Sequence, residues 1–167
     1  MDAQMREQSR CNLAAEVLQS SGTLHIRAMG TSMLPTLWPG DLVTIQSQDF
    51  EQVEPGEIVL FLREGRFFLH RAVKKSGVGK AVFLLTRGDS MPQNDPPVQP
   101  GELLGRVTGI RRGGSVIAPV RRLSWFDLML ARLLGYSNLC QRLALRRRGR
   151  GRDFNSGFEF SGDQAVV

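Results

Sequence analysis

Six short runs of β-branched, aromatic and other apolar residues fill the middle of the chain and constrain its fold more than any other feature. Each run is six to eight residues long, and no helical periodicity separates one from the next. The runs occupy residues 24–29, 41–46, 57–62, 66–73, 81–87 and 103–110. Strands that follow one another without intervening helices predict a mainly β body of short twisted strands, which we place at residues 23–118.

The connections between these runs carry residues typical of tight turns. The tripeptide Pro-Gly-acid occurs at residues 39–41, 55–57 and 100–102, and an apolar run follows each time. Proline and glycine at the two central positions suit a type II turn, so we expect such turns at these strand entries. Glu64 and Gly65 separate two other runs and predict a two-residue hairpin.

A short helix is predicted before the β body. Residues 12–20 have helical character, with Asn12 as a possible N-cap and Gly22 as the terminator. We therefore treat residues 1–22 as an N-terminal helical segment.

A basic helical extension is predicted after the β body, over residues 119–152. Within it, residues 123–135 place Trp125, Leu128, Met129 and Arg132 on one stripe. Residues 153–167 have the composition of a disordered tail.

The charge is unevenly distributed. The net charge is +6, but residues 111–167 hold 11 of the 22 lysines and arginines and only four of the 16 acids, which gives 11 − 4 = +7. Residues 1–110 therefore carry 11 − 12 = −1. A nearly neutral body argues against a nucleic-acid-binding domain.

Metal, cofactor and membrane-spanning functions receive no support. The chain has two cysteines and two histidines, in no metal-binding pattern, so we expect no metal and no cofactor. It contains no apolar stretch of the ~18–20 residues that a transmembrane helix needs, and its N-terminus does not resemble a secretory signal. A location in the cytoplasm or at the periphery of a membrane is expected.

Two residues could carry chemistry. In the run 66–73, His70 shares one strand face with Phe68 and Ala72. Ser32 follows the first run in a bent segment bounded by glycine and proline. A serine in such a place can be a nucleophile or can simply stabilise a turn, and a strand histidine is often structural.

Four ordered sequence blocks resemble the type I signal peptidases and their LexA-type serine-peptidase relatives. The chain has Ser-Met-Leu-Pro-Thr at 32–36 with Gly-Asp at 40–41, and an apolar strand from Gly56. His-Arg-Ala-Val at 70–73 is similar to the histidine branch found in the endoplasmic reticulum and in archaea. Arg-Gly-Asp-Ser at 87–90, with Asp95 six residues after Asp89, fits the remaining block.

The resemblance implies a division of roles among these residues. Ser32 would be the nucleophile and His70 the general base, with Asp95 orienting the imidazole. Asp89 is the alternative for that third role, unless it binds backbone groups in its turn. The backbone N–H of Ser32 and of a neighbour would bind the oxyanion. The residues expected to line the oxyanion and substrate site are Gly30, Thr31, Met33 and Pro35.

Three details refine this assignment. Gly30 stands where signal peptidases usually carry a small hydroxyl residue, so one oxyanion donor would be missing, as in the LexA-type relatives. Lys74 lies ~13 Å along the strand from His70, too far to serve as the base in its place. Ser90 is interpreted as a turn residue.

The leading hypothesis is a serine endopeptidase that cleaves leader or signal segments of peptide or protein precursors. A LexA-type self-cleaving regulator is the second, although about 22 residues before the first strand are too few for a helix-turn-helix domain. A non-catalytic peptide-binding module is the third. Residues 123–152 could contact a membrane surface, dock a partner protein, or cover the β core with their apolar stripe. The sequence specifies neither the substrate nor the oligomeric state.

Overall fold

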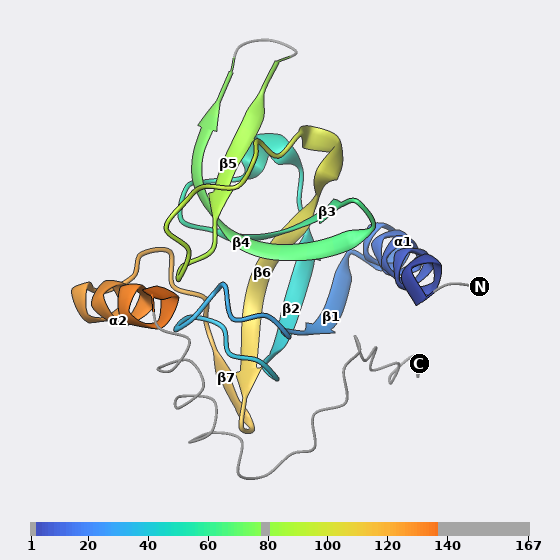
Figure 1. The fold of residues 1–167 in the computed structure, drawn as a ribbon. Helices are drawn as coiled ribbons and strands as arrows, with labels where there is room; N and C mark the ends of the chain where they lie inside the picture. Colours follow the sequence, from blue (N-terminus) through green and yellow to red (C-terminus); the bar gives the residue numbers. More distant parts are fainter. Residues whose placement is uncertain (1–2, 78–80, 137–167) are drawn as a thin grey trace.

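The computed structural model describes residues 3–77 and 81–136, and its described part is built around one antiparallel sheet (Figure 1). Six strands are hydrogen-bonded in the order β1-β2-β6-β3-β4-β5, and β7 pairs with β6. The strands are β1 (Thr23–Arg27), β2 (Leu42–Ser47), β3 (Ile58–Arg63), β4 (Arg66–Ser76), β5 (Phe83–Arg87), β6 (Leu103–Arg112) and β7 (Ser115–Ile117). The mainly β fold predicted from the sequence is confirmed.

Each of the six predicted runs forms a strand, with ends that shift by a few residues. The structure adds a seventh strand, β7, which the sequence analysis missed because it is only three residues long. Gly113 and Gly114, with φ of +56° and +90°, form the turn that leads into it. A Gly-Gly pair between two apolar segments is a hairpin signal that could have revealed this strand.

The turn predictions are right at three positions and wrong at one. Glu64 and Gly65 both have positive φ, as a two-residue hairpin requires. Gly40 and Gly56 have φ of +92° and +95°, as expected in type II turns. Pro100–Glu102 instead forms a 3-10 helix, η2, because the Glu102 carboxylate accepts a hydrogen bond from the Gln99 N–H and pairs with Arg63.

The N-terminal helix is longer than predicted. Helix α1 spans Ala3–Ser21, so Asn12 lies in its middle and is not its N-cap. The prediction began the helix at Asn12 as an N-cap, whereas the good helix formers before residue 11 extend the helix towards the N-terminus. Its end is as predicted, because Gly22 has φ of +72° and its N–H donates to the Leu18 carbonyl.

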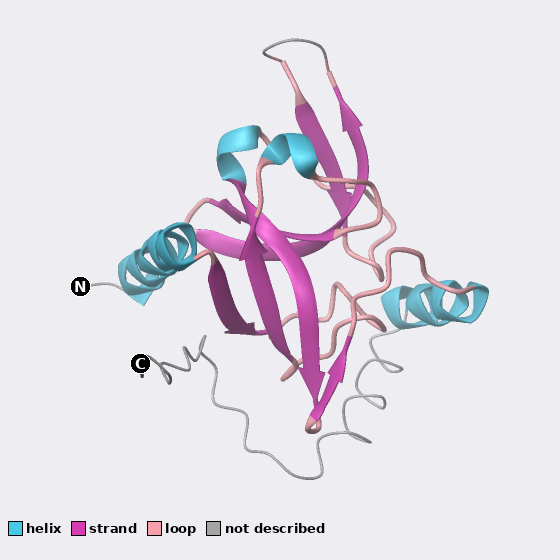
Figure 2. Cartoon of the chain, turned by 180° about the vertical axis from the view of Figure 1, so that it is seen from behind, coloured by secondary structure: helices cyan, strands magenta, loops and turns pink. Residues whose placement is uncertain are grey.

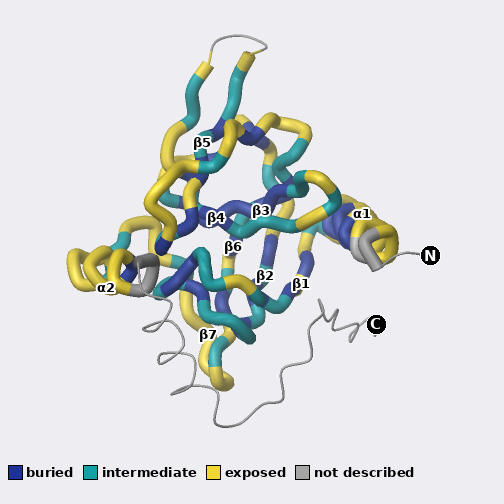
Figure 3. The backbone as a smooth tube through the Cα atoms, viewed as in Figure 1, coloured by how far each residue is buried: buried dark blue, intermediate teal, exposed yellow. Residues whose placement is uncertain are grey.

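Most of the buried residues form two hydrophobic clusters. Figure 3 shows where the buried positions lie along the chain. The larger lies between α1 and strands that include β1, β2 and β6, and Phe67 and Leu69 of β4 pack against it. The smaller cluster contains Ala72 of β4 and Phe50, which lies in the 3-10 helix η1 (Phe50–Gln52). Phe68 of β4 packs against this smaller cluster. Since alternate β4 side chains point to opposite faces, His70 lies on the side of the smaller cluster.

A second helix, α2 (Trp125–Tyr136), lies at the opposite end of the molecule from α1 (Figures 1 and 2). Ser124 begins it, exchanging hydrogen bonds with Asp127 in a capping-box arrangement. The predicted extension beyond residue 136 and the predicted tail at 153–167 lie outside the described residues. Neither helix in the described part is long and apolar enough to cross a membrane.

Candidate active site

Ser32 lies in a tight turn between β1 and β2. The side chains of Met33 and Leu34, which follow it, are buried at 3% and 0% exposure and anchor the turn in the core. The Leu37 N–H donates to the Met33 carbonyl over 2.9 Å and closes the turn. This anchoring fixes the backbone that carries the Ser32 hydroxyl.

Ser32, His70 and Asp95 form one hydrogen-bonded line. The Ser32 Oγ lies 3.0 Å from His70 Nε2, and His70 Nδ1 lies 2.6 Å from Asp95 Oδ2. The three residues come from the turn after β1, from β4 and from the loop after β5. The fold therefore brings together three side chains that are far apart in the sequence.

The carboxylate of Asp95 determines where the imidazole carries its proton. Burial alone would raise the pKa of the Asp95 carboxyl group, but hydrogen bonds from His70 and Thr86 and the charges of His70 and Arg63 hold it below its ordinary value. A carboxylate can only accept hydrogen bonds, so Nδ1 of the imidazole donates. In a neutral imidazole, Nε2 is then left to accept the Ser32 proton.

The imidazole is well shielded from water. His70 is 8% exposed, and the rings of Phe61 and Phe68 stand edge-on to it at centroid distances of 6.2 and 6.1 Å. Thr86, fully buried on β5, donates over 2.6 Å to the same carboxylate oxygen, Asp95 Oδ2, that His70 contacts. These contacts fix the imidazole and its partner in one orientation.

Asp89 occupies a different place from Asp95. Its carboxylate pairs with Arg71, with Nε–Oδ1 and Nη2–Oδ2 distances of 2.7 and 2.8 Å, and accepts a hydrogen bond from Thr36. Asp95, and not Asp89, contacts His70. The groups that Asp89 binds are side chains, not the backbone of its own turn. The sequence analysis quoted Arg71 and Thr36 as motif residues but gave them no role.

Ser90 lies in a turn, as predicted, and its side chain also contacts the Ser32 turn. It is 6% exposed, and its hydroxyl lies 3.0 Å from the carbonyl oxygen of Thr31 and 2.9 Å from that of Ser32. Gly88 allows this close approach, because a Cβ at this position would lie 2.6 Å from the Ser32 carbonyl oxygen. Nothing in the sequence distinguished Ser90 from an ordinary turn serine.

The remaining predicted site residues surround Ser32 in different ways. Gly30 is exposed, and a Cβ built on it would lie 4.0 Å from Ser32 Oγ. Thr31 and Pro35 are partly exposed beside the nucleophile turn. The Met33 side chain lies in the core, so only its backbone is available to a substrate. Lys74 is exposed.

Comparison with known families agrees with this fold. Residues 2–108 match the Peptidase S24-like family over more than half of the chain. The chain belongs to the Peptidase S24-like family. This membership confirms the resemblance to signal peptidases and LexA-type peptidases stated from the sequence motifs.

More distant similarity links this S24-like chain to the catalytic subunits of signal peptidase complexes. It is 28% identical to the sec11 subunit of Sclerotinia sclerotiorum over 66% of its own length and 72% of the relative's. It is also 28% identical to the SEC11 subunit of Colletotrichum graminicola, over 69% and 68% of the two chains. The corresponding subunit of Pyricularia oryzae is 30% identical over 60% and 59%. The family implies a serine peptidase with a protein or peptide substrate.

Proposed function

We propose that the protein is a serine endopeptidase that cleaves leader or signal segments from peptide or protein precursors. The observation that carries the proposal is the hydrogen-bonded line from Ser32 through His70 to Asp95. The similarity to signal peptidase catalytic subunits supports precursors as the substrate class. We place the activity in the cytoplasm or at the periphery of a membrane.

In the proposed first step, Ser32 Oγ attacks the carbonyl carbon of the scissile peptide bond while His70 Nε2 takes the hydroxyl proton. Asp95 stabilises the resulting imidazolium through Nδ1. The backbone N–H of Ser32 and of a neighbour bind the oxyanion. His70 then returns the proton to the leaving amine, and the C–N bond breaks to leave an acyl-enzyme.

In the second step, His70 removes a proton from water as the water attacks the acyl-enzyme. Collapse of the tetrahedral intermediate releases the carboxyl product, and His70 returns the proton to Ser32 Oγ. The same residue therefore acts as base and acid in both halves of the reaction.

The test compares wild-type protein with Ser32→Ala and His70→Ala on a peptide library that spans leader-type cleavage sites, with products read by mass spectrometry. We expect cleavage by the wild type alone, next to small residues as the resemblance to signal peptidases implies. Equal cleavage by all three proteins would show that this Ser-His pair is not the active site. If none of the three cleaves, with or without lipid vesicles, the non-catalytic peptide-binding alternative is favoured.

A further inference from the structure

Helix α2 turns its large apolar side chains away from the protein. At 100° per residue, Trp125, Phe126, Met129, Leu130 and Leu133 fall within an arc of about 140°. They are between 41% and 76% exposed. The sequence analysis allowed that the stripe with Trp125, Leu128 and Met129 covers the β core, but these three residues are 48–66% exposed.

The opposite face of α2, which is turned towards the protein, carries the small residue Ala131. Ala131 is 1% exposed, whereas its large neighbours along the helix are exposed. A helix that folds for its own domain's core would place its large apolar residues inward and its polar residues outward. An exposed apolar face of this size marks an interaction surface.

The sequence of the segment that contains α2 indicates the chemistry of the partner. Residues 119–152 contain nine arginines and a single acid, Asp127. Apolar aromatic side chains combined with arginines suit the interface of an anionic bilayer, where the rings enter the headgroup boundary and the guanidinium groups bind lipid phosphates. A purely acidic protein surface would match the arginines but would leave the apolar arc in water.

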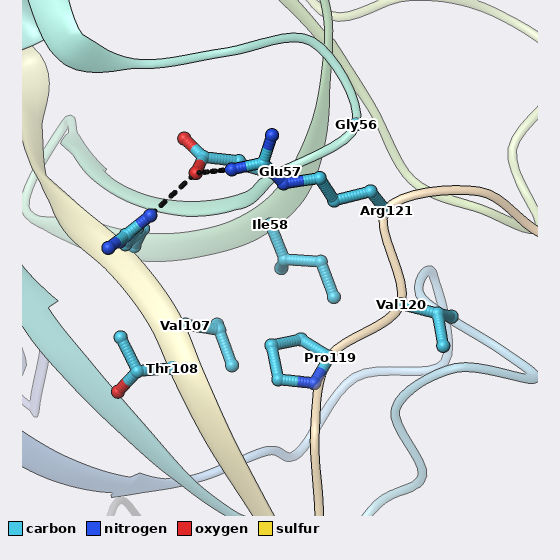
Figure 4. A pocket seen from close by; sticks show the side chains of 9 residues that line it. Gly56, Glu57, Ile58, Val107, Thr108, Pro119, Val120 and Arg121 are labelled. Atoms are coloured by element: carbon cyan, nitrogen blue, oxygen red, sulfur yellow. Dashed lines mark hydrogen bonds and ion pairs between the residues drawn. The ribbon is translucent and has the colours of Figure 1, made fainter.

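The segment before α2 is fixed to the body of the protein. The Val120 carbonyl accepts a hydrogen bond from Arg71 Nη1 over 2.7 Å, and Arg121 Nη2 lies 3.1 Å from Glu57 Oε1. Residues 119–121 thus form one wall of a cavity of about 290 Å³, in which Arg106 also pairs with Glu57 (Figure 4). The contacts of Val120 and Arg121 thus fix the segment that leads into α2 against β4 and the residue that precedes β3.

The contact of Val120 with Arg71 connects the segment before α2 to the candidate active site. Arg71, which binds Val120, directly follows His70 on β4, and it also holds Asp89. In Figures 1 and 2, α2 lies beside the loop that follows β5, the loop that carries Ser90 and Asp95. A surface bound by α2 would therefore lie on a defined side of the Ser32 turn.

We propose that α2 is an interfacial membrane-docking helix that binds the protein to an anionic lipid surface. Trp125, Phe126 and Leu133 enter the headgroup boundary, and the exposed Arg122 and Arg132 bind lipid phosphates. The docking itself is independent of the proposed peptidase activity. If that activity holds, docking would present the Ser32 site to precursors at the same surface.

The test is flotation of the full chain with vesicles of phosphatidylcholine alone or of phosphatidylcholine mixed with phosphatidylglycerol. We expect binding to the mixed vesicles, weaker binding at high salt, and partitioning at least about tenfold weaker for Trp125→Ser/Phe126→Ser. The matched control is Leu13→Ser, since Leu13 is 63% exposed on the distant helix α1 and its loss should leave flotation unchanged. Ser32→Ala should float like the wild type, so a failure of proteolysis remains distinguishable from a failure of docking.

A second readout reports the depth of the helix directly. Brominated phosphatidylcholine in the mixed vesicles should quench part of the tryptophan emission of the wild type, and Trp125→Phe should abolish that part while retaining flotation. The proposal is overturned if the wild type does not bind the mixed vesicles or if Trp125→Ser/Phe126→Ser floats as well as the wild type. It is also overturned if Trp125 is not quenched, or if the aromatic pair instead supports self-association in sedimentation without lipid.

Discussion

The carbonyl oxygen of Ser32 lies 2.9 Å both from the backbone nitrogen of Ser90 and from its hydroxyl oxygen. The backbone of the proposed nucleophile is thus held from a loop more than fifty residues away. Ser90 touches no reacting atom, so its role is to position Ser32.

The first prediction concerns this contact. Ser90→Ala removes a buried hydrogen bond worth about 1–2 kcal/mol, and we expect kcat to fall about tenfold with little change in KM. Steady-state kinetics on a cleaved peptide would measure the split between the two constants. Ser90→Thr, which keeps the hydroxyl, should recover most of the loss. An unchanged kcat in folded Ser90→Ala would show that the backbone contact alone is sufficient.

The two aspartates of the same block should respond differently to removal of their charge. Asp95→Asn should lower kcat/KM by roughly three orders of magnitude, because the amide can hold the imidazole in the wrong tautomer. Its fold should remain, as near-UV circular dichroism would show. The same loss of activity in Asp95→Asn and Asp89→Asn at equal stability would contradict the separate roles assigned to them.

Asp89→Asn is expected to act on stability. It leaves Arg71, whose side chain is 11% exposed, without its carboxylate partner, and breaking such a buried ion pair costs about 3 kcal/mol. Urea unfolding of this variant beside the wild type would measure the loss. Glu54→Gln is a suitable control, because the pair of Glu54 with Arg121 is more than half exposed and should contribute little.

Substitution of Gly30 should increase the activity of the proposed peptidase. Its φ is not positive, and a Cβ at this position would lie 4.0 Å from Ser32 Oγ, so a serine there would bring a hydroxyl group to the oxyanion side of the turn. We expect Gly30→Ser to raise kcat at least about tenfold, because loss of one oxyanion donor typically costs about a hundred- to a thousandfold. Gly30→Ala is the control for the added Cβ, and an equal response to both substitutions would exclude the hydroxyl as the cause.

Acid should destabilise the fold through three carboxylates. Burial opposes ionisation of Asp95 and Glu57, but hydrogen bonds outweigh its effect and lower both pKa values. At Glu102 the hydrogen bond from Arg63 is the main cause that lowers the pKa. All three pKa values therefore lie below their ordinary values. The unfolded chain therefore binds more protons than the folded one as the pH falls below the ordinary values of 3.8 and 4.5. The contribution of these three groups to the free energy of unfolding should thus be constant above about pH 5.5 and fall towards about pH 3.5.

Urea titrations at these pH values would measure the change. Glu102→Gln should flatten part of the acid limb, because it removes one of the three groups. A free energy of unfolding that stays level or rises on acidification would contradict the assigned direction of the pKa values.

The strands, and the face of β4 on which His70 lies, could be predicted because they depend on local patterns. The alternation in residues 66–73 correctly separates Phe67 and Leu69 from Phe68 and Ala72. The turns at Glu64-Gly65, Gly40 and Gly56 were predictable because their residues fit the φ values that those turns need.

Other features depend on contacts between distant segments and carry no local signal. Pro100–Glu102 becomes a 3-10 helix where Glu102 meets Arg63. The buried hydroxyls of Ser90 and Thr86 acquire their importance only from the segments packed against them. The choice between Asp95 and Asp89 likewise depended on the path of a proline-rich loop, which sequence patterns do not specify.

The order in which the proposed triad leaves the ribosome has a consequence for the cell. Ser32 is synthesised first, His70 later, and Asp95 only after β5, yet each needs the others in place before the serine can be activated. The nascent chain therefore carries an inert hydroxyl until its last strands have paired. If the proposed peptidase activity holds, delayed maturation of this kind would protect neighbouring polypeptides, and the protein itself, from premature cleavage.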